Sequence, residues 1–203
     1  MSSKRKEQAA ATRQKIIDES QRLIGEKGFL HVTVDDIASA CGIAKGTLYH
    51  YFQSKEDIFS YIERGTFREI RESVDQMEWP SAFAKLSRFI EIWCDHVARD
   101  NLNLSRDWHR LAVEFKIPNS DHRTHLDDDM ENAVHFLREG IESGEFSPAL
   151  PAEAVARDIV FSMYGASFYR CSTYTEFDIA AWGREFSKEI LALHVAPYRI
   201  SKG

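Results

Sequence analysis

Cysteine is scarce in this sequence, and its positions exclude most of the chemistry that cysteine supports. Cys41, Cys94 and Cys171 are far apart and odd in number, and no CxxC pair occurs. A zinc site or a disulfide framework is therefore not expected. Each cysteine lies on an apolar stripe and is interpreted as a small buried hydrophobe. A redox-sensing role for Cys94 or Cys171 is the alternative.

Long apolar runs and alternating strand patterns are also missing. No run approaches the roughly 18–20 apolar residues of a membrane helix, and no apolar stretch follows the charged N-terminus as in a signal peptide. We therefore expect a cytoplasmic protein with no membrane partner. The mixed charge and 43% hydrophobic content indicate a folded globular chain.

Helical periodicity recurs along the whole chain, and glycine and proline mark its interruptions. This pattern predicts an all-α fold of about nine helices. An N-terminal three-helix head over residues 1–55 precedes a helical body over residues 56–203. The predicted helices cover residues 7–27, 34–41, 45–52, 54–77, 81–100, 104–115, 120–143, 152–171 and 175–195.

Residues 33–57 are the most informative segment, because they read as two short helices joined by a tight turn. Thr33 precedes an apolar-periodic stretch and Asp36 follows three residues later, a capping box with aspartate in place of the usual Glu or Gln. Gly42 stands where a left-handed backbone ends the first helix. This arrangement is a helix-turn-helix, which places its second helix in the major groove of DNA.

The second helix of this motif carries its donor-rich residues on one face. Leu48, Tyr51 and Phe52 are expected to face back toward the first helix. The outer face then holds Lys45, Gly46, Thr47, Tyr49 and His50, which suit contacts to phosphates, base edges and thymine methyl groups. Lys55 follows at the start of the next helix, where a DNA phosphate is the expected partner.

The charge distribution supports this interpretation, although the net charge is −6. Residues 1–55 contain nine Lys or Arg and six Asp or Glu, a balance of +3, while the remainder has a balance of −9. The basic end is therefore the end with the motif. Lys4, Arg5, Lys6 and Arg13 are possible additional DNA contacts, and a solvated terminus is the alternative.

The segment Gly42-Ile-Ala-Lys-Gly-Thr-Leu-Tyr-His-Tyr-Phe-Gln-Ser-Lys-Glu-Asp-Ile58, with Thr33 to Ala38 before it, closely resembles the DNA-binding domain of the tetracycline-repressor (TetR) family. The resemblance covers about the first 60 residues. It implies DNA contacts for Thr33, Lys45, Thr47, Tyr49, His50, Tyr51 and Lys55. Ala44 departs from the pattern, since family members often have a capping Ser or Thr there.

The resemblance further implies a homodimer in which the last two long helices of each copy form a four-helix bundle. Two recognition helices related by a two-fold axis would read a palindromic operator in double-stranded DNA. The alternative is that the same apolar residues only complete the core of one chain. The candidate interface residues are Val155, Ile159, Met163, Ala166, Tyr169, Phe177, Ala181 and Ile190.

The middle helices are rich in aromatic residues with interleaved polar groups, a composition typical of small-molecule sites. The resemblance implies a pocket for an effector there, which we expect to be apolar or amphipathic. Such a ligand could also be anionic if Arg106 or Arg170 points inward, and a simple aromatic core is the alternative. The candidate lining residues are Phe89, Trp93, His96, Trp108, His109, Phe115, Phe136, Phe161, Tyr164 and Phe168.

Two patterns that could indicate other chemistry are weaker. His122, His125 and the run Asp127 to Asp129 resemble metal ligands, but successive aspartates point in different directions and suit the solvated first turn of a helix. No Gly-x-Ser-x-Gly turn surrounds a serine, so an enzyme is not expected. No metal and no cofactor are expected either.

These features together predict a homodimeric, ligand-released transcriptional repressor. Two alternatives stay open. One is an architectural or division-linked DNA-binding factor without an inducer, and the other is a helical enzyme or protein-interaction module that retains the head.

Overall fold

The computed structural model describes residues 2–100, 102–114, 125–173 and 176–200. These residues are almost entirely helical, which confirms the predicted all-α class, and their only β pairing is one bridge between Phe146 and Arg199. The helices are α1 (Ser2–Lys27), α2 (Val34–Cys41), α3 (Lys45–Tyr51), α4 (Lys55–Asp75), α5 (Ala82–Arg99), α6 (Leu102–Glu114), α7 (His125–Glu142), α8 (Ala152–Ser172), α9 (Ile179–Glu185) and α10 (Leu191–Val195).

Side-chain caps fix several helix starts. The hydroxyl of Ser81 accepts a hydrogen bond from the Ala84 N–H at 3.1 Å, so α5 begins where the sequence predicts. The carboxylate of Asp178 accepts one from the Ala181 N–H at 2.9 Å, so the last long helix begins at Ile179 rather than at residue 175. A π-helical turn over Phe186–Ile190 joins α9 to α10.

The chain divides into two compact units. The first contains the described residues within 1–65 and 106–122, and the second contains those within 66–105 and 123–203. The division falls within α4 and within α6, so each of these helices contributes to both units. The domain boundary expected near residue 55 stays a prediction.

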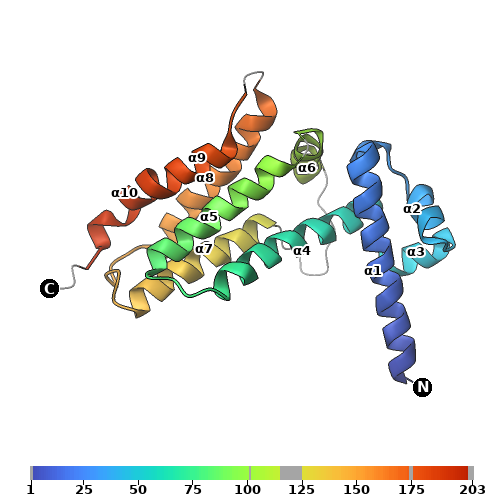
Figure 1. The fold of residues 1–203 in the computed structure, drawn as a ribbon, viewed down its shortest axis with the longest axis horizontal. Coiled ribbons are helices and arrows are strands. Elements are labelled where there is room, and N and C mark those ends of the chain that lie inside the picture. The colour runs from blue at the N-terminus through green and yellow to red at the C-terminus, as the bar shows by residue number, and fades with distance from the viewer. Residues whose placement is uncertain (1, 101, 115–124, 174–175, 201–203) are drawn as a thin grey trace. The chain divides into compact units, whose positions relative to one another are not determined.

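In the first unit α2 packs against α1, and α3 packs against α2 (Figure 1). Side chains from all of its helices form its core and are excluded from solvent. Burying such aliphatic and aromatic groups contributes about 1.5–3 kcal/mol each. The most deeply buried are Ile16, Phe29, Ile37, Leu48 and Ile58.

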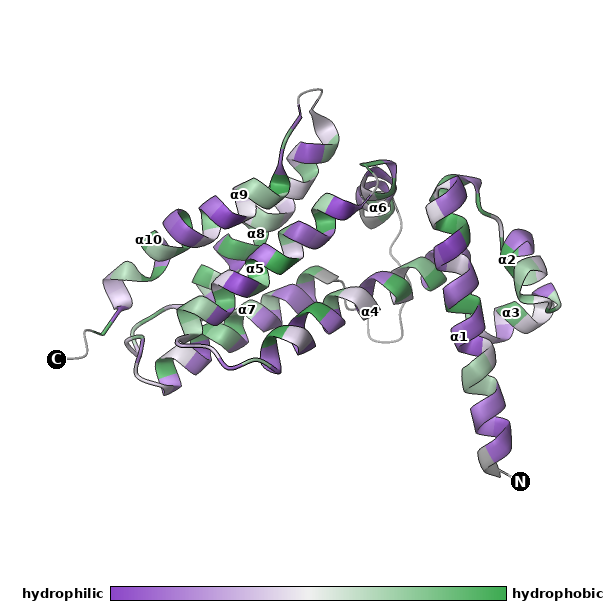
Figure 2. Cartoon of the chain, viewed as in Figure 1, coloured by the Kyte–Doolittle hydropathy of each residue, from purple (hydrophilic) through white to green (hydrophobic). Residues whose placement is uncertain are grey.

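The second unit is a bundle in which α5, α7, α8 and α9 lie side by side (Figure 1). Hydrophilic and hydrophobic colours alternate along α5 in Figure 2, as expected for a helix with one buried face. Helices α5 and α9 approach closely at Gly183, where an added Cβ would lie 2.6 Å from the Cβ of Cys94. Among the described helices, none is long and apolar enough to cross a membrane.

Candidate functional site

Local hydrogen bonds build the turn of the helix-turn-helix. The Thr33 hydroxyl accepts from the Asp36 N–H at 3.1 Å, and the Asp36 carboxylate accepts from the Thr33 N–H at 2.9 Å, which confirms the predicted capping box. The Thr33 hydroxyl also donates to that carboxylate, and these bonds lower the pKa of Asp36. Gly42 ends α2 with a left-handed φ of 65°, as the sequence predicts.

The recognition helix α3 presents the predicted residues to solvent. Leu48 is fully buried beneath it and Phe52 nearly so, which orients the opposite face outward. Ala44 occupies the N-cap position without a side-chain bond, as expected from its departure from the family pattern. Gly46 has open space where a Cβ would stand. Lys45, Thr47, Tyr49 and His50 are exposed with it, and Tyr51 is half-buried against His50.

An ion pair engages one of these residues. The ammonium of Lys45 lies 2.8 Å from the Asp35 carboxylate on α2, and this bond raises the pKa of Lys45. Both side chains are exposed, so water screens the pair and its stabilisation is small. A DNA phosphate would therefore compete with Asp35 for the Lys45 ammonium.

Lys55 makes contacts within the head that the sequence did not predict, and its DNA contact stays a prediction. Its ammonium points inward and donates to the carbonyl oxygens of Phe29 at 3.1 Å and Val32 at 3.0 Å. It also lies 4.4 Å from the centre of the Phe29 ring, a favourable cation–π distance. These contacts fix the segment that links α1 to α2, so Lys55 stabilises the head.

Internal contacts also engage Arg13, a possible DNA contact, and the start of α4. Arg13 lies over the rings of Phe52 and Tyr61 at 5.0 and 4.0 Å and is thus directed into the head. Ser54 caps α4 by accepting from the Asp57 N–H at 3.2 Å. The Asp57 carboxylate accepts from the Gln53 N–H at 3.0 Å and so fixes the chain just before the helix.

The candidate effector residues are divided between the two units, and within the second unit between its core and the surface of α8. Phe89, Trp93 and Phe136 are buried in the second unit, where Tyr164 and His96 pack at the same aromatic cluster. Trp108 and His109 belong to the first unit and contact each other edge to face. Phe161 and Phe168 are 54% and 59% exposed on α8, so they line no interior site. Phe115 lies outside the described residues.

A buried carboxyl that sequence reasoning missed lies within the aromatic cluster. Asp129 on α7 has no solvent exposure. Its Oδ2 accepts hydrogen bonds from the Trp93 indole N–H at 3.0 Å and the Tyr164 hydroxyl at 2.9 Å. Asp127 and Asp128 lie in the first turn of the helix, as the predicted dipole-stabilised turn requires, but Asp129 points into the core. Burial raises the pKa of Asp129 to about 7.

Arg170 fulfils a structural role in the same unit. Its guanidinium donates to the Ser105 hydroxyl at 3.1 Å and to the carbonyl oxygens of Ala98 and Asp100 at 3.4 and 3.1 Å. These bonds satisfy the carbonyl groups at the end of α5. The inward-pointing cation considered for an anionic effector is therefore already engaged.

Half of the candidate dimer residues face the interior of a single chain. Val155, Ile159, Met163 and Ala166 are buried in the core of the second unit, so the alternative that they complete the monomer core holds for them. Tyr169, Ala181 and Ile190 are exposed, and Phe177 is half-buried against Tyr169. The large apolar side chains on the exposed side of α8 are instead Phe161, Phe168 and Tyr169.

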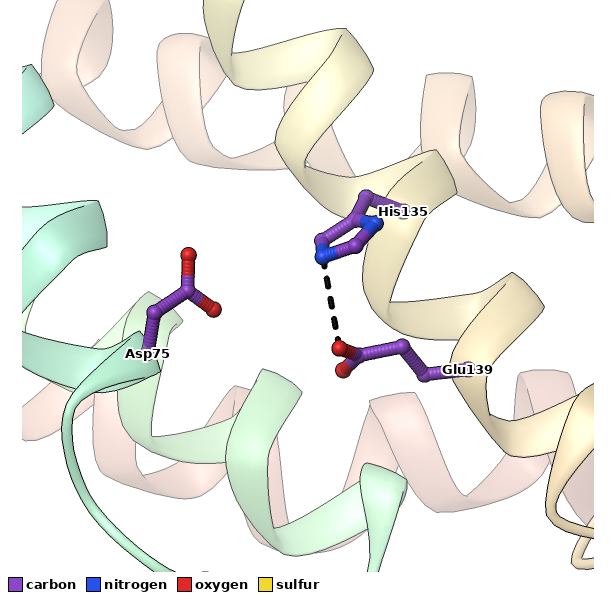
Figure 3. A group of neighbouring side chains, drawn as sticks. All are labelled: Asp75, His135 and Glu139. Atoms are coloured by element: carbon purple, nitrogen blue, oxygen red, sulfur yellow. Dashed lines mark ion pairs between the residues drawn. The ribbon is translucent and has the colours of Figure 1, made fainter.

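One group of side chains has the composition of a metal site, as Figure 3 shows: Asp75, His135 and Glu139, with His135 and Glu139 paired on α7. The ammonium of Lys85 lies 2.8 Å from the Asp75 carboxylate and 2.9 Å from that of Glu139. A cation therefore already stands between the two carboxylates. The cluster is an ion-pair network that ties α4 to α5 and α7.

Comparison with known proteins places these features in a family. Residues 16–62 match the model for bacterial regulatory proteins of the tetR family. The fatty acid metabolism regulator protein of Bacillus subtilis is 31% identical over 157 residues, which cover 72% of this chain and 76% of that protein. The chain belongs to the TetR family. TetR-family proteins are transcriptional regulators and generally not enzymes, and this chain is a transcriptional regulator of that family.

Other TetR-family relatives match the body as well as the head. The repressor KstR2 of Mycobacterium tuberculosis is 29% identical over 159 residues, covering 75% of this chain and 78% of that protein. The structure of Bacillus subtilis FadR in complex with stearoyl-CoA superimposes with a TM-score of 0.65 at 25% identity, covering 90% of this chain and 97% of that one. Family members bind DNA as dimers and bind small-molecule ligands.

Proposed function

We propose that this chain is a homodimeric repressor that a fatty acyl-CoA releases from a palindromic operator. The similarity to the Bacillus subtilis fatty acid metabolism regulator carries this proposal, because it spans 76% of that protein and so includes the ligand-binding body. The FadR structure with stearoyl-CoA supports the same ligand class.

DNA contact is assigned to the exposed face of α3. Thr47, Tyr49 and His50 are free of the core and suit base edges and sugar–phosphate groups. On binding DNA, the Lys45 ammonium leaves Asp35 and pairs with a phosphate. Thr33, at the start of α2, contacts the sugar–phosphate backbone of the DNA. Two copies of α3, about 34–36 Å apart or a small multiple of that distance, would read the two halves of a palindrome.

We assign dimerisation to a surface formed by the exposed apolar face of α8, the π-helical turn over Phe186–Ile190 and α10. Phe161, Phe168 and Tyr169 are each more than half exposed, as is Leu193, and Ile190 is 40% exposed. Large apolar side chains gathered on neighbouring helices of one unit mark a surface that is covered in the working molecule. Gly165, also exposed, allows close approach of a second helix along this face.

Release requires that the effector bind one conformation of the dimer better than the other. The difference in affinity for the two states sets the change in DNA affinity, typically about 1–3 kcal/mol or roughly 5- to 150-fold. The apolar interior of the second unit suits an acyl chain.

Fluorescence anisotropy with a labelled fragment of the promoter region of its own gene tests the proposal. We expect specific binding at moderate salt and release by stearoyl-CoA, with free coenzyme A and stearate as controls. Specific binding that no acyl-CoA reverses would leave a DNA-binding regulator and refute the effector. Absence of any sequence preference would refute the operator as well.

A steroid is the second candidate effector, because KstR2 of Mycobacterium tuberculosis, a ketosteroid transcriptional regulator, matches this chain over a similar span. A ketosteroid added in the same anisotropy experiment distinguishes the two classes. Release by the steroid and not by acyl-CoA would favour this second assignment.

A further inference from the structure

The carboxyl group of Asp129 is incompletely satisfied in the folded chain. Its Oδ2 accepts two hydrogen bonds, from Trp93 on α5 and Tyr164 on α8. Its Oδ1 is buried and has no hydrogen-bond partner. Buried polar atoms are almost always paired, and an unpaired one commonly marks a missing water, ion or ligand. The orphaned Oδ1 is therefore the feature to be explained.

The surroundings of this carboxyl are aromatic and without a compensating cation among the described residues. The Trp93 ring packs against Tyr164 at 5.4 Å and stacks on Phe67 at 5.8 Å. The charge that acts most on Asp129 is the neighbouring carboxylate of Asp128, which has the same sign. Both burial and this neighbour favour the protonated acid.

A protonated Asp129 has its hydrogen on Oδ1, because both bonds to Oδ2 are donated by the protein. Oδ1 is then a buried donor without an acceptor. Neutral acids kept in apolar sites serve as hydrogen-bond donors to ligand oxygens. The matching ligand group is an oxygen acceptor on an otherwise apolar molecule, and a carbonyl oxygen fits this description.

We infer that the Oδ1 hydroxyl of Asp129 donates a hydrogen bond to the carbonyl oxygen of the effector. The effector class is thereby an apolar molecule with one buried carbonyl group. This inference rests on the proposed function, in which that group is the thioester carbonyl of an acyl-CoA. Trp93 and Tyr164 act as positioning residues, since their two bonds to Oδ2 leave Oδ1 as the oxygen that carries the hydrogen.

A matched pair of ligands tests this contact in the full-length protein by isothermal titration calorimetry. The first is lauroyl-CoA, and the second is S-dodecyl-CoA, a thioether of the same chain length that lacks the carbonyl oxygen. We expect the thioester to bind about ten-fold tighter at pH 6.5. Equal affinities would overturn the inference and leave the proposed function intact, whereas no binding of either ligand would overturn both.

Asp129→Asn is the decisive variant, because its amide keeps the acceptor for Trp93 and Tyr164 and still offers an N–H donor. This variant should retain the preference for the thioester. Loss of this preference would overturn the inference. Asp127→Asn, an exposed change on the same helix, is the control and should leave both affinities unchanged.

The pH dependence of the preference gives a second readout that needs no variant to fold. The acid loses its donor when it ionises, so the preference of the native protein should decline between pH 6.5 and 8.5. The other titratable groups near the cluster are Asp128 on α7, Tyr164 on α8 and His96 on α5, which contacts Phe67. All three are retained in Asp129→Asn, so a flat profile in that variant assigns the change to Asp129. A parallel decline in both proteins would overturn the assignment.

Discussion

Replacing Asp129 with asparagine should change the pH dependence of stability in a defined direction. The unfolded carboxyl ionises near its usual pKa of 3.8, whereas burial raises the pKa in the folded chain to about 7. The folded state therefore retains a proton that the unfolded state has lost between these values. The free energy of unfolding of the native protein falls as pH rises through this window and is level above it.

The expected magnitude follows from the same pKa values. Each unit of difference between the folded and unfolded pKa corresponds to about 1.36 kcal/mol. The whole pKa difference of Asp129 therefore lowers the free energy of unfolding by roughly 4 kcal/mol once the group is ionised in the folded chain. Asparagine does not ionise, so the stability of Asp129→Asn relative to the native protein should rise by about 3 kcal/mol between pH 5 and 8. Urea unfolding followed by circular dichroism measures both proteins at one fixed concentration, because dimer stability depends on concentration.

Asp127→Asn provides the matched control for this experiment. It makes the same chemical change two residues away on the same helix, but the side chain is exposed. Its effect on helix-dipole energy, about 0.3–1 kcal/mol, should change little between pH 5 and 8. A stability difference between Asp129→Asn and the native protein that is constant over this range would refute the reasoning.

Three further predictions address the head and the dimer surface. Asp35→Asn should release the Lys45 ammonium from its ion pair and tighten DNA binding about two- to five-fold at low salt. Fluorescence anisotropy measures this affinity, and weaker binding would mean that Asp35 orients Lys45. Lys55→Ala should lower the free energy of unfolding by about 1–3 kcal/mol, because the hydrogen bonds to two carbonyl groups are lost. Unchanged stability, together with a salt dependence of DNA binding whose slope falls by roughly 1, would instead indicate that Lys55 contacts a phosphate. Phe168→Asp should give a monomer in analytical ultracentrifugation, whereas Met77→Asp, equally exposed, should not; a dimer in both would exclude the α8 surface.

Features set by neighbouring residues were predictable from the sequence. The capping box of Thr33 and Asp36 and the left-handed Gly42 involve atoms only a few positions apart, so residue type and spacing suffice to specify them. The buried position of Leu48 follows from helical periodicity in the same way. These local rules also identified the exposed face of α3.

Side chains with partners far along the chain were not predictable. Lys55 reaches carbonyl groups more than twenty residues earlier, and no local pattern distinguishes such a lysine from one that extends into solvent. Asp129 follows two aspartates of the same type, and only the packing of α5 and α8 against α7 directs it inward. A partial signal existed in its spacing from Ala133 and Phe136, which continue the buried stripe of α7.

By itself, the sequence determined the helical class, the helix-turn-helix and the residues that its second helix presents, because short-range backbone geometry governs all three. The tertiary structure alone decided which face of α8 is buried. Apolar residues occur all around that helix, so periodicity cannot choose between Ile159 and Phe161, and only packing against α7 and α9 does. It likewise placed one carboxyl in an aromatic interior, where desolvation makes it a titrating group near neutral pH.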